Sequence, residues 1–197
     1  MLEQQLVLKY KGGRDYLHGT DMFNETLTWL NSQRKDVKEI DFAFHRLAIR
    51  QLKAVLGPLP EGIMPVAVCS FTSGGVRESV SLVETDHPVM ERYPYPEDEI
   101  VSPMVIDIAG RKGVLSCETA YSDIELWVAM TKALHQKVFS QLKGKWLFVR
   151  ARFPQFVRHA AAKERTLVIA ASFNDKLTRS EVFLDGVKSG EIYFSIV

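Results

Sequence analysis

Two stretches of the sequence, residues 70–82 (SFTSGGVRESVSL) and residues 172–184 (SFNDKLTRSEVFL), align without a gap at an offset of 102 residues. Five positions hold the same residue, where composition alone gives about one match. Three further pairs of segments follow in the same order at offsets of 98 to 104: residues 6–12 with 104–110, 20–21 with 122–123, and 42–46 with 146–150. We therefore predict an internal duplication.

The boundary between the two halves is predicted where the composition changes. Residues 93–99 (YPYPEDE) hold two prolines, which lack backbone donors, and three consecutive acids, which favour solvent. This segment is typical of a surface connector. The first repeat is expected to cover residues 1–95 and the second residues 96–197, with the linker at about 93–99.

Each half shows the same order of predicted elements. A short apolar strand ends at Gly12 or Gly110, and a helix follows, capped by Thr20 or Asp21 in one half and by Ser122 or Asp123 in the other. The second helix is apolar nearly all round, which predicts burial. The remainder is rich in β-branched and aromatic residues, with hairpin-turn signals at residues 185–186 and 189–190. The pattern predicts an α+β fold in which an antiparallel sheet wraps around a long buried helix, twice.

This order of elements resembles the hotdog fold of thioesterases and hydroxyacyl-thioester dehydratases. The resemblance covers nearly the whole chain and implies two tandem hotdog-like repeats packed as one pseudo-dimeric unit. It also implies acyl-coenzyme A (acyl-CoA) or acyl carrier protein as the substrate. It rests on element order and duplication, because no diagnostic motif of the family is present. The alternative is a generic α+β domain whose helices pack on one face of a sheet.

Composition excludes several other classes of protein. The chain has 197 residues, 46% of them hydrophobic, and a formal net charge of +1, so it carries no global attraction to nucleic acid or membranes. No apolar run is long enough to cross a bilayer, and the first residues lack the pattern of a signal peptide, so a cytoplasmic location is expected. The two cysteines fit a reducing compartment and supply no metal-binding set. No phosphate loop, nucleophile elbow or metal motif occurs, and no cofactor is predicted.

The densest group of titratable residues before a helix is residues 14–21 (RDYLHGTD). A helix N-terminus offers unpaired amides and partial positive charge, which can hold a thioester carbonyl or its oxyanion. His18 beside it is a candidate general base, and the resemblance places it close to that carbonyl. Tyr16, Gly19 and Asp21 are predicted to line the substrate site. Alternatively, Asp21 only caps the helix and His18 lies in solvent.

Glu125 is the second candidate catalytic residue, because a carboxylate in the first turn of an apolar helix is costly to bury without a partner. The resemblance implies that Glu125 works with a histidine from the opposite hotdog, His18. Tyr121 and Asp123 lie in the equivalent region of the second half and are predicted to bind substrate. The histidine motif typical of the dehydratases is absent. The alternative role for Glu125 is an acid favoured by the helix dipole.

A basic patch is predicted between residues 150 and 165. It holds Arg150, Arg152, Arg158, Lys163 and Arg165 against Glu164 alone, a local net charge of +4. Arg150, Arg152 and Arg158 are predicted to meet the phosphates of CoA or an acidic carrier protein. The alternative is a solvated strand face and loop.

The sequence thus predicts an acyl-thioester enzyme, dehydratase-like or thioesterase-like. A non-catalytic acyl-binding or structural double-hotdog protein is the alternative. Neither a nucleic acid nor a membrane is predicted as a partner, and a homo-oligomer is left open.

Overall fold

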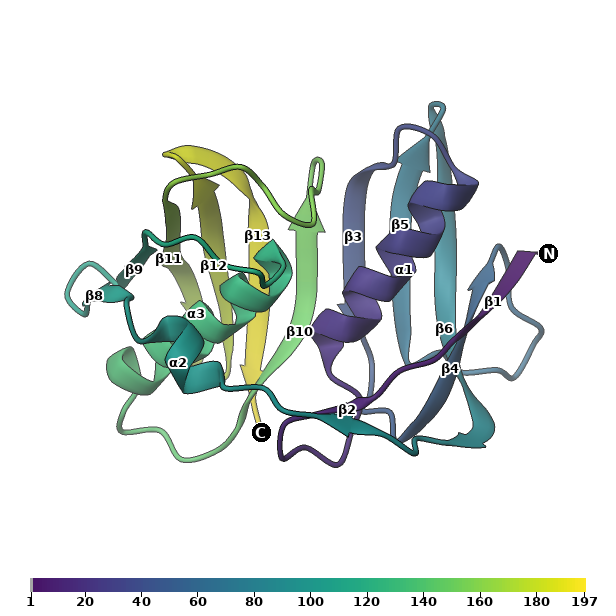
Figure 1. Ribbon diagram of the computed structural model, residues 1–197, viewed down its shortest axis with the longest axis horizontal. Coiled ribbons are helices and arrows are strands. Elements are labelled where there is room, and N and C mark those ends of the chain that lie inside the picture. Colours follow the sequence, from purple (N-terminus) through teal and green to yellow (C-terminus); the bar gives the residue numbers. More distant parts are fainter. Residues whose placement is uncertain (1) are drawn as a thin grey trace. The chain divides into compact units, whose positions relative to one another are not determined.

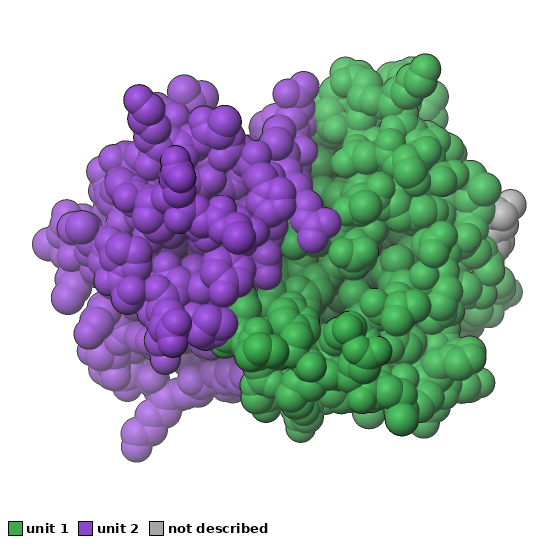
Figure 2. All heavy atoms as spheres, in the orientation of Figure 1, with its two compact units in different colours: residues 1–95 green, residues 96–197 purple. Residues whose placement is uncertain are grey.

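The computed structural model describes residues 2–197. The chain divides into two compact units, Met1–Tyr95 and Pro96–Val197, which are coloured separately in Figure 2.

Unit 1 is an antiparallel sheet with one helix against it (Figure 1). Its elements are β1 (Leu2–Leu6), β2 (Tyr10–Lys11), α1 (Gly19–Gln33), β3 (Lys38–Phe44), β4 (Arg50–Leu56), β5 (Ala67–Ser73), β6 (Val76–Pro88) and β7 (Arg92–Tyr93). The order of strands in the sheet is β1-β4-β6-β5-β3. The short strands β2 and β7 pair in parallel, which brings the two ends of the unit together.

The core of unit 1 lies between α1 and the sheet. Phe23 and Leu30 of α1 are fully buried, and the ring of Phe23 lies 5.3 Å from that of Phe42 on β3. Each fully buried side chain of this size stabilises the fold by roughly 1.5–3 kcal/mol relative to its exposed state. Cys69 on β5 is also fully buried, and the loss of hydration raises the pKa of its thiol.

Unit 2 is likewise an antiparallel sheet with a helix against it. Its elements are α2 (Glu97–Val101), β8 (Val105–Asp107), β9 (Lys112–Leu115), α3 (Asp123–Val138), β10 (Trp146–Phe153), β11 (Arg165–Phe173), β12 (Leu177–Leu184) and β13 (Val187–Ile196). The order of strands is β10-β13-β12-β11-β9-β8. No helix in the part of the chain from residue 2 onward is long and apolar enough to cross a membrane.

The core of unit 2 contains a histidine. His135 of α3 is fully buried among the rings of Phe139, Trp146 and Phe194. Its Nδ1 lies 2.6 Å from the carbonyl of Thr131, and its Nε2 lies 2.7 Å from the hydroxyl of Thr178. A carbonyl only accepts, so Nδ1 carries the hydrogen and Nε2 accepts from Thr178. Burial lowers the pKa of His135 from 6.5 to about 4.

This histidine makes the stability of the protein depend on pH. Between pH 6.5 and 4 the unfolded chain binds a proton at His135 and the folded chain does not, so stability falls as pH falls through this range. We expect the free energy of unfolding in urea to be about 2 kcal/mol lower at pH 5 than at pH 7. His135→Gln, which has no titrating group there, is the control. An equal pH dependence in that variant would contradict this assignment.

The strand orders correct one part of the predicted duplication. β4 and β11 are the second strands after the helix in unit 1 and unit 2. In unit 1 β4 pairs with β6, and in unit 2 β11 pairs with β12. However, the duplication matches β5 of unit 1 with β11 of unit 2. β5 is the third strand after its helix and pairs with the first, β3, whereas β11 is the second strand after its helix. The alignment of residues 70–73 with residues 172–175 therefore does not match equivalent positions. The place of a strand depends on pairing with distant strands, which local sequence does not encode.

Three local predictions also need correction. Residues 93–99 are not simply a connector, because Tyr93 belongs to β7 and the acids from Glu97 onward form the first turn of α2. The closing hairpin turns only at residues 185–186, where Asp185 and Gly186 both have positive φ. The second turn signal lies inside β13, where a Cβ on Gly190 would collide with the ring of Phe153. The third correction is at the start of α1, where the N-cap is His18.

Candidate functional site

The N-terminus of α3 is closed by the chain's own groups. Ser122, one of the two predicted caps, is the N-cap and forms a capping box with Glu125: the Ser122 side chain accepts from the backbone N–H of Glu125, and Glu125 Oε2 accepts from the backbone N–H of Ser122 at 2.9 Å. The hydroxyl of Ser122 also donates to Glu125 Oε2 at 2.7 Å. The N–H of Asp123 donates to the carbonyl of Arg158 at 2.8 Å. Glu125 thus has a structural task in the first turn, whatever else it does.

Asp123 is buried in a second set of contacts. Its Oδ1 accepts from Arg165 Nε at 2.6 Å and its Oδ2 from the N–H of Ala160 at 2.6 Å. Arg165 also donates to the carbonyls of Ala160 and Ala162 at 3.0 and 3.2 Å. We call these contacts the Asp123–Arg165 clamp, because they fasten the loop between β10 and β11 to the start of α3. Since Arg165 is only 5% exposed, its assignment to a solvent-facing basic patch was wrong.

The start of α1 is different. The N-cap is His18 rather than Thr20 or Asp21, and no side chain caps the helix. The N–H groups of Asp21 and Met22 donate to the carbonyl of His18, and the hydrogen bonds found among residues 2–197 include none from the N–H groups of Gly19 and Thr20. These two amides and the helix dipole make the start of α1 suited to hold an anion or a polarised carbonyl.

A buried polar cluster supports this helix start. We call it the Lys11 cluster; its members are Lys11, His18, Thr20, Asp21, Tyr93 and Tyr95. The ammonium of Lys11, whose side chain is fully buried, donates to Thr20 Oγ1 at 3.1 Å and to Asp21 Oδ1 at 2.9 Å. It also lies 4.2 Å from the ring centre of Tyr95, a cation–π distance. All six members of the cluster belong to unit 1.

His18 joins the cluster through Thr20. Its Nδ1 lies 2.7 Å from Thr20 Oγ1, and its ring centre lies 6.3 Å from that of Tyr95. Tyr93 donates to Asp21 Oδ2 at 2.7 Å, so both carboxylate oxygens of Asp21 are bonded. His18 is 7% exposed, and the alternative of a solvated loop histidine is therefore wrong. The arrangement presents an imidazole and two unbonded amides at one helix start.

The other predicted site residues lie in varied surroundings. Tyr16 is buried at 8% exposure, and Gly19 is half-buried as the first residue of α1. In unit 2, Tyr121 is half-buried, Arg150 is half-buried with its guanidinium 5.9 Å from the ring centre of Tyr193, and Arg152 and Arg158 are exposed.

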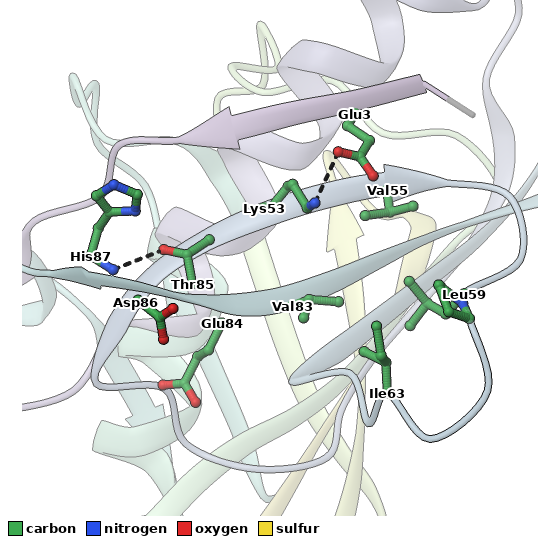
Figure 3. A pocket seen from close by; sticks show the side chains of 11 residues that line it. Glu3, Lys53, Val55, Leu59, Ile63, Val83, Glu84, Thr85, Asp86 and His87 are labelled. Carbon is green, nitrogen blue, oxygen red and sulfur yellow. Dashed lines mark hydrogen bonds and ion pairs between the residues drawn. The ribbon is translucent and has the colours of Figure 1, made fainter.

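A separate pocket of about 350 Å³ lies against β4 and β6 of unit 1 (Figure 3). Val55 and Val83 lie at its base and Leu59 and Ile63 on the loop that borders it. Its charged residues are already paired: Glu3 with Lys53 at 2.9 Å, Asp86 with Arg50 at 3.7 Å, and Glu84 with Arg46. Burial raises the pKa of Glu84, but hydrogen bonds from Arg46 and the N–H of Ile49 outweigh it and leave the pKa low. The pocket offers no equivalent of the Lys11 cluster.

The sequence analysis did not identify Lys11, Tyr93 or Tyr95 as site residues. It treated Thr20 only as a possible helix cap. Lys11 was taken as part of the short strand that ends at Gly12, and the tyrosines were taken as part of the connector. The available signal was the pair of tyrosines alternating with prolines in residues 93–96, since large aromatic residues are unusual in a solvated linker.

Comparison with known proteins shows a likeness in structure alone. No family model and no characterised protein sequence matches the chain. Among solved structures, the dehydratase domain of PpsC from Mycobacterium tuberculosis, in complex with C12:1-CoA, matches with a TM-score of 0.55 at 11% identity. The match covers 99% of this chain and 92% of that one.

Two further structures are similar over nearly their whole length. The tesB protein of Mycobacterium avium subsp. paratuberculosis matches with a TM-score of 0.54 at 11% identity, over 96% of this chain and 91% of that one. The pyran synthase domain from module nine of the sorangicin pathway matches with a TM-score of 0.53 at 9% identity, over 98% and 92%. These neighbours are hotdog-fold proteins. The α+β architecture and these matches together show that the chain has the hotdog fold.

Proposed function

We propose that this protein is an acyl-thioester enzyme, dehydratase-like or thioesterase-like, whose reaction takes place at the N-terminus of α1. The observation that carries the proposal is a buried histidine, His18, beside two amides that have no partner within the described part of unit 1. A thioester carbonyl accepts hydrogen bonds, and its oxygen gains negative charge in both hydrolysis and α-proton removal. The site supplies the donors and the base that both reactions need.

The chemistry assigns distinct roles within the site. The N–H groups of Gly19 and Thr20 donate to the thioester oxygen, and the dipole of α1 stabilises the charge that develops there. His18 takes a proton, either from a water molecule or from the carbon next to the carbonyl. Tyr16 and Asp21 shape the substrate site from unit 1.

We also propose that the two units are tandem hotdog repeats and that unit 2 contributes the remaining predicted residues. Glu125 is proposed as the second proton-transfer group, with Tyr121 and Asp123 near the substrate. Because Glu125 accepts hydrogen bonds from Ser122, it would have to transfer a proton while it also caps α3. Arg150, Arg152 and Arg158 are proposed to meet the phosphates of acyl-CoA or an acidic carrier protein. One structural neighbour, the PpsC dehydratase domain, was solved with an acyl-CoA, which supports this substrate class.

A turnover assay tests the proposal and separates the two reactions. We expect the protein to act on acyl-CoA or 3-hydroxyacyl-CoA of some chain length. Release of free thiol identifies a thioesterase, and the ultraviolet absorbance of a conjugated enoyl thioester identifies a dehydratase. Glu125→Gln keeps an acceptor for the cap and tests the second group. Binding of acyl-CoA without turnover would favour the non-catalytic acyl-binding alternative, and no binding would contradict the proposal.

A further inference from the structure

We infer that Thr20 and Asp21, held by Lys11, fix the tautomer of His18 so that Nδ1 carries the hydrogen and Nε2 is the proton acceptor. The inference rests on the proposed function only in calling this histidine a base. It concerns positioning residues, because neither Thr20 nor Asp21 is assigned a reacting atom through its side chain.

The first step concerns Lys11. An ammonium group donates and never accepts, so in the 3.1 Å contact with Thr20 Oγ1 the threonine oxygen is the acceptor. One lone pair of the threonine hydroxyl is thereby used. Its hydrogen and its second lone pair are left for two remaining neighbours, His18 Nδ1 at 2.7 Å and Asp21 Oδ1 at 3.3 Å.

The second step concerns Asp21. An ionised carboxylate only accepts, so in its contact with Thr20 the hydrogen comes from the threonine. The carboxylate is ion-paired with Lys11 and accepts from Tyr93, and it lies in the first turn of α1, where the helix dipole favours negative charge. In each of these contacts the carboxylate of Asp21 is the acceptor.

The third step follows from counting. If Thr20 donates to Asp21 and accepts from Lys11, its remaining lone pair accepts from His18, and Nδ1 must carry the hydrogen. Thr20 then uses both lone pairs and its hydrogen, as expected for a hydroxyl that is fully buried. The opposite direction leaves one lone pair of Thr20 unused and gives up its bond to Asp21. The chain of donors running from His18 through Thr20 to a carboxylate also strengthens each bond in it.

The consequence is that His18 can act as a proton acceptor through Nε2. With Nδ1 protonated and held by Thr20, Nε2 has the lone pair and can accept a proton from substrate or water. When His18 becomes charged in the reaction, the negative Asp21 at the end of the chain stabilises it and Lys11 opposes it. The side-chain hydroxyl of Thr20 and the carboxylate of Asp21 therefore position and tune the base through hydrogen bonds, a role separate from that of the Thr20 backbone N–H.

The test is the tautomer itself. In the intact protein labelled with nitrogen-15 at histidine and held at pH 8, long-range proton–nitrogen correlation spectra distinguish a protonated ring nitrogen from an unprotonated one. We expect His18 to have its hydrogen on Nδ1, with the signal assigned by its loss in His18→Asn. His135 is the internal reference, since its bond to the carbonyl of Thr131 requires the same tautomer. A hydrogen on Nε2 of His18 in the wild-type protein would overturn the inference.

Substitution of Thr20 tests the same inference through the rate of turnover. Thr20→Val removes the hydroxyl and keeps the shape, and we expect the single Nδ1 tautomer to be lost and kcat to fall about 10-fold with KM little changed. Thr20→Ser should restore both. If the wild-type protein shows the Nδ1 tautomer but turns over no thioester, the proposed function fails and the positioning network stands. If the wild-type protein turns over thioesters with the hydrogen on Nε2, the proposed function stands and the inference about the tautomer fails.

Discussion

Replacing His18 with asparagine should lower thioester turnover by at least about 100-fold while leaving the fold intact. The loss of a general base typically costs 10²- to 10⁴-fold in rate. The amide nitrogen of asparagine corresponds in position to Nδ1 of histidine and can still donate to Thr20, so the Lys11 cluster keeps its hydrogen bond. His18→Gln should lose turnover to a similar extent, but its longer side chain places the amide where Nε2 was.

Steady-state turnover and thermal unfolding check this prediction together. Because His18 is buried and bonded, the glutamine variant is expected to lose more stability than the asparagine variant. His45→Asn, at an exposed histidine of the same unit, is the matched control and should keep full activity. Wild-type turnover in His18→Asn would remove His18 from the mechanism.

The order of elements could be predicted from the sequence because its signals are local. The helix that follows Ser122 was found from a capping residue, Ser122 or Asp123, and an apolar run. The structure adds Glu125, which forms a capping box with Ser122. The hairpin at Asp185 and Gly186 was found because two successive residues with positive φ need such residue types. These features depend on neighbours within about four residues.

Strand order and the Lys11 cluster could not be predicted, because both depend on distant contacts. In unit 1, β5 pairs with β3 although β4 comes between them in the chain, and nothing in residues 67–73 states this. The cluster forms because β2 pairs with β7, which brings Tyr93 to Asp21 across 72 residues of chain. A buried lysine is also rare, so burial of Lys11 is not expected until its partners are known.

The position of His18 could be predicted because the residues around it have a local sequence signal. Residues 14–21 stood out because several titratable side chains precede a helix, and this placed His18 correctly beside its start. Glu125 and Asp123 both make structural contacts at the start of α3, and for Glu125 this agrees with its alternative role as an acid in the first turn of the helix. The two helix starts therefore look alike in sequence and differ in structure: one has unbonded amides and the other is capped by its own chain.

Breaking the Asp123–Arg165 clamp should have the largest effect on stability. The two side chains are 3% and 6% exposed, so Arg165→Met leaves a buried carboxylate without its counter-charge. Such a loss typically costs about 3–5 kcal/mol, because the charge cannot be solvated by water. We expect urea unfolding to show a decrease of this size. The double variant Arg165→Met with Asp123→Asn should recover part of it, because no charge is then left buried.

The clamp also fastens a loop, and this gives the prediction a second, independent measurement. Without Arg165 the carbonyls of Ala160 and Ala162 lose their donors, so the loop should detach from α3 more often than the unit unfolds. Limited trypsin digestion under native conditions should then cut faster at Arg158 and Lys163, which lie on that loop. Lys53→Met is the matched control, because its pair with Glu3 is 39% and 41% exposed and should contribute less than about 1 kcal/mol. If Arg165→Met loses no more stability than Lys53→Met and its loop is cut no faster, then the clamp does not hold the start of α3 closed.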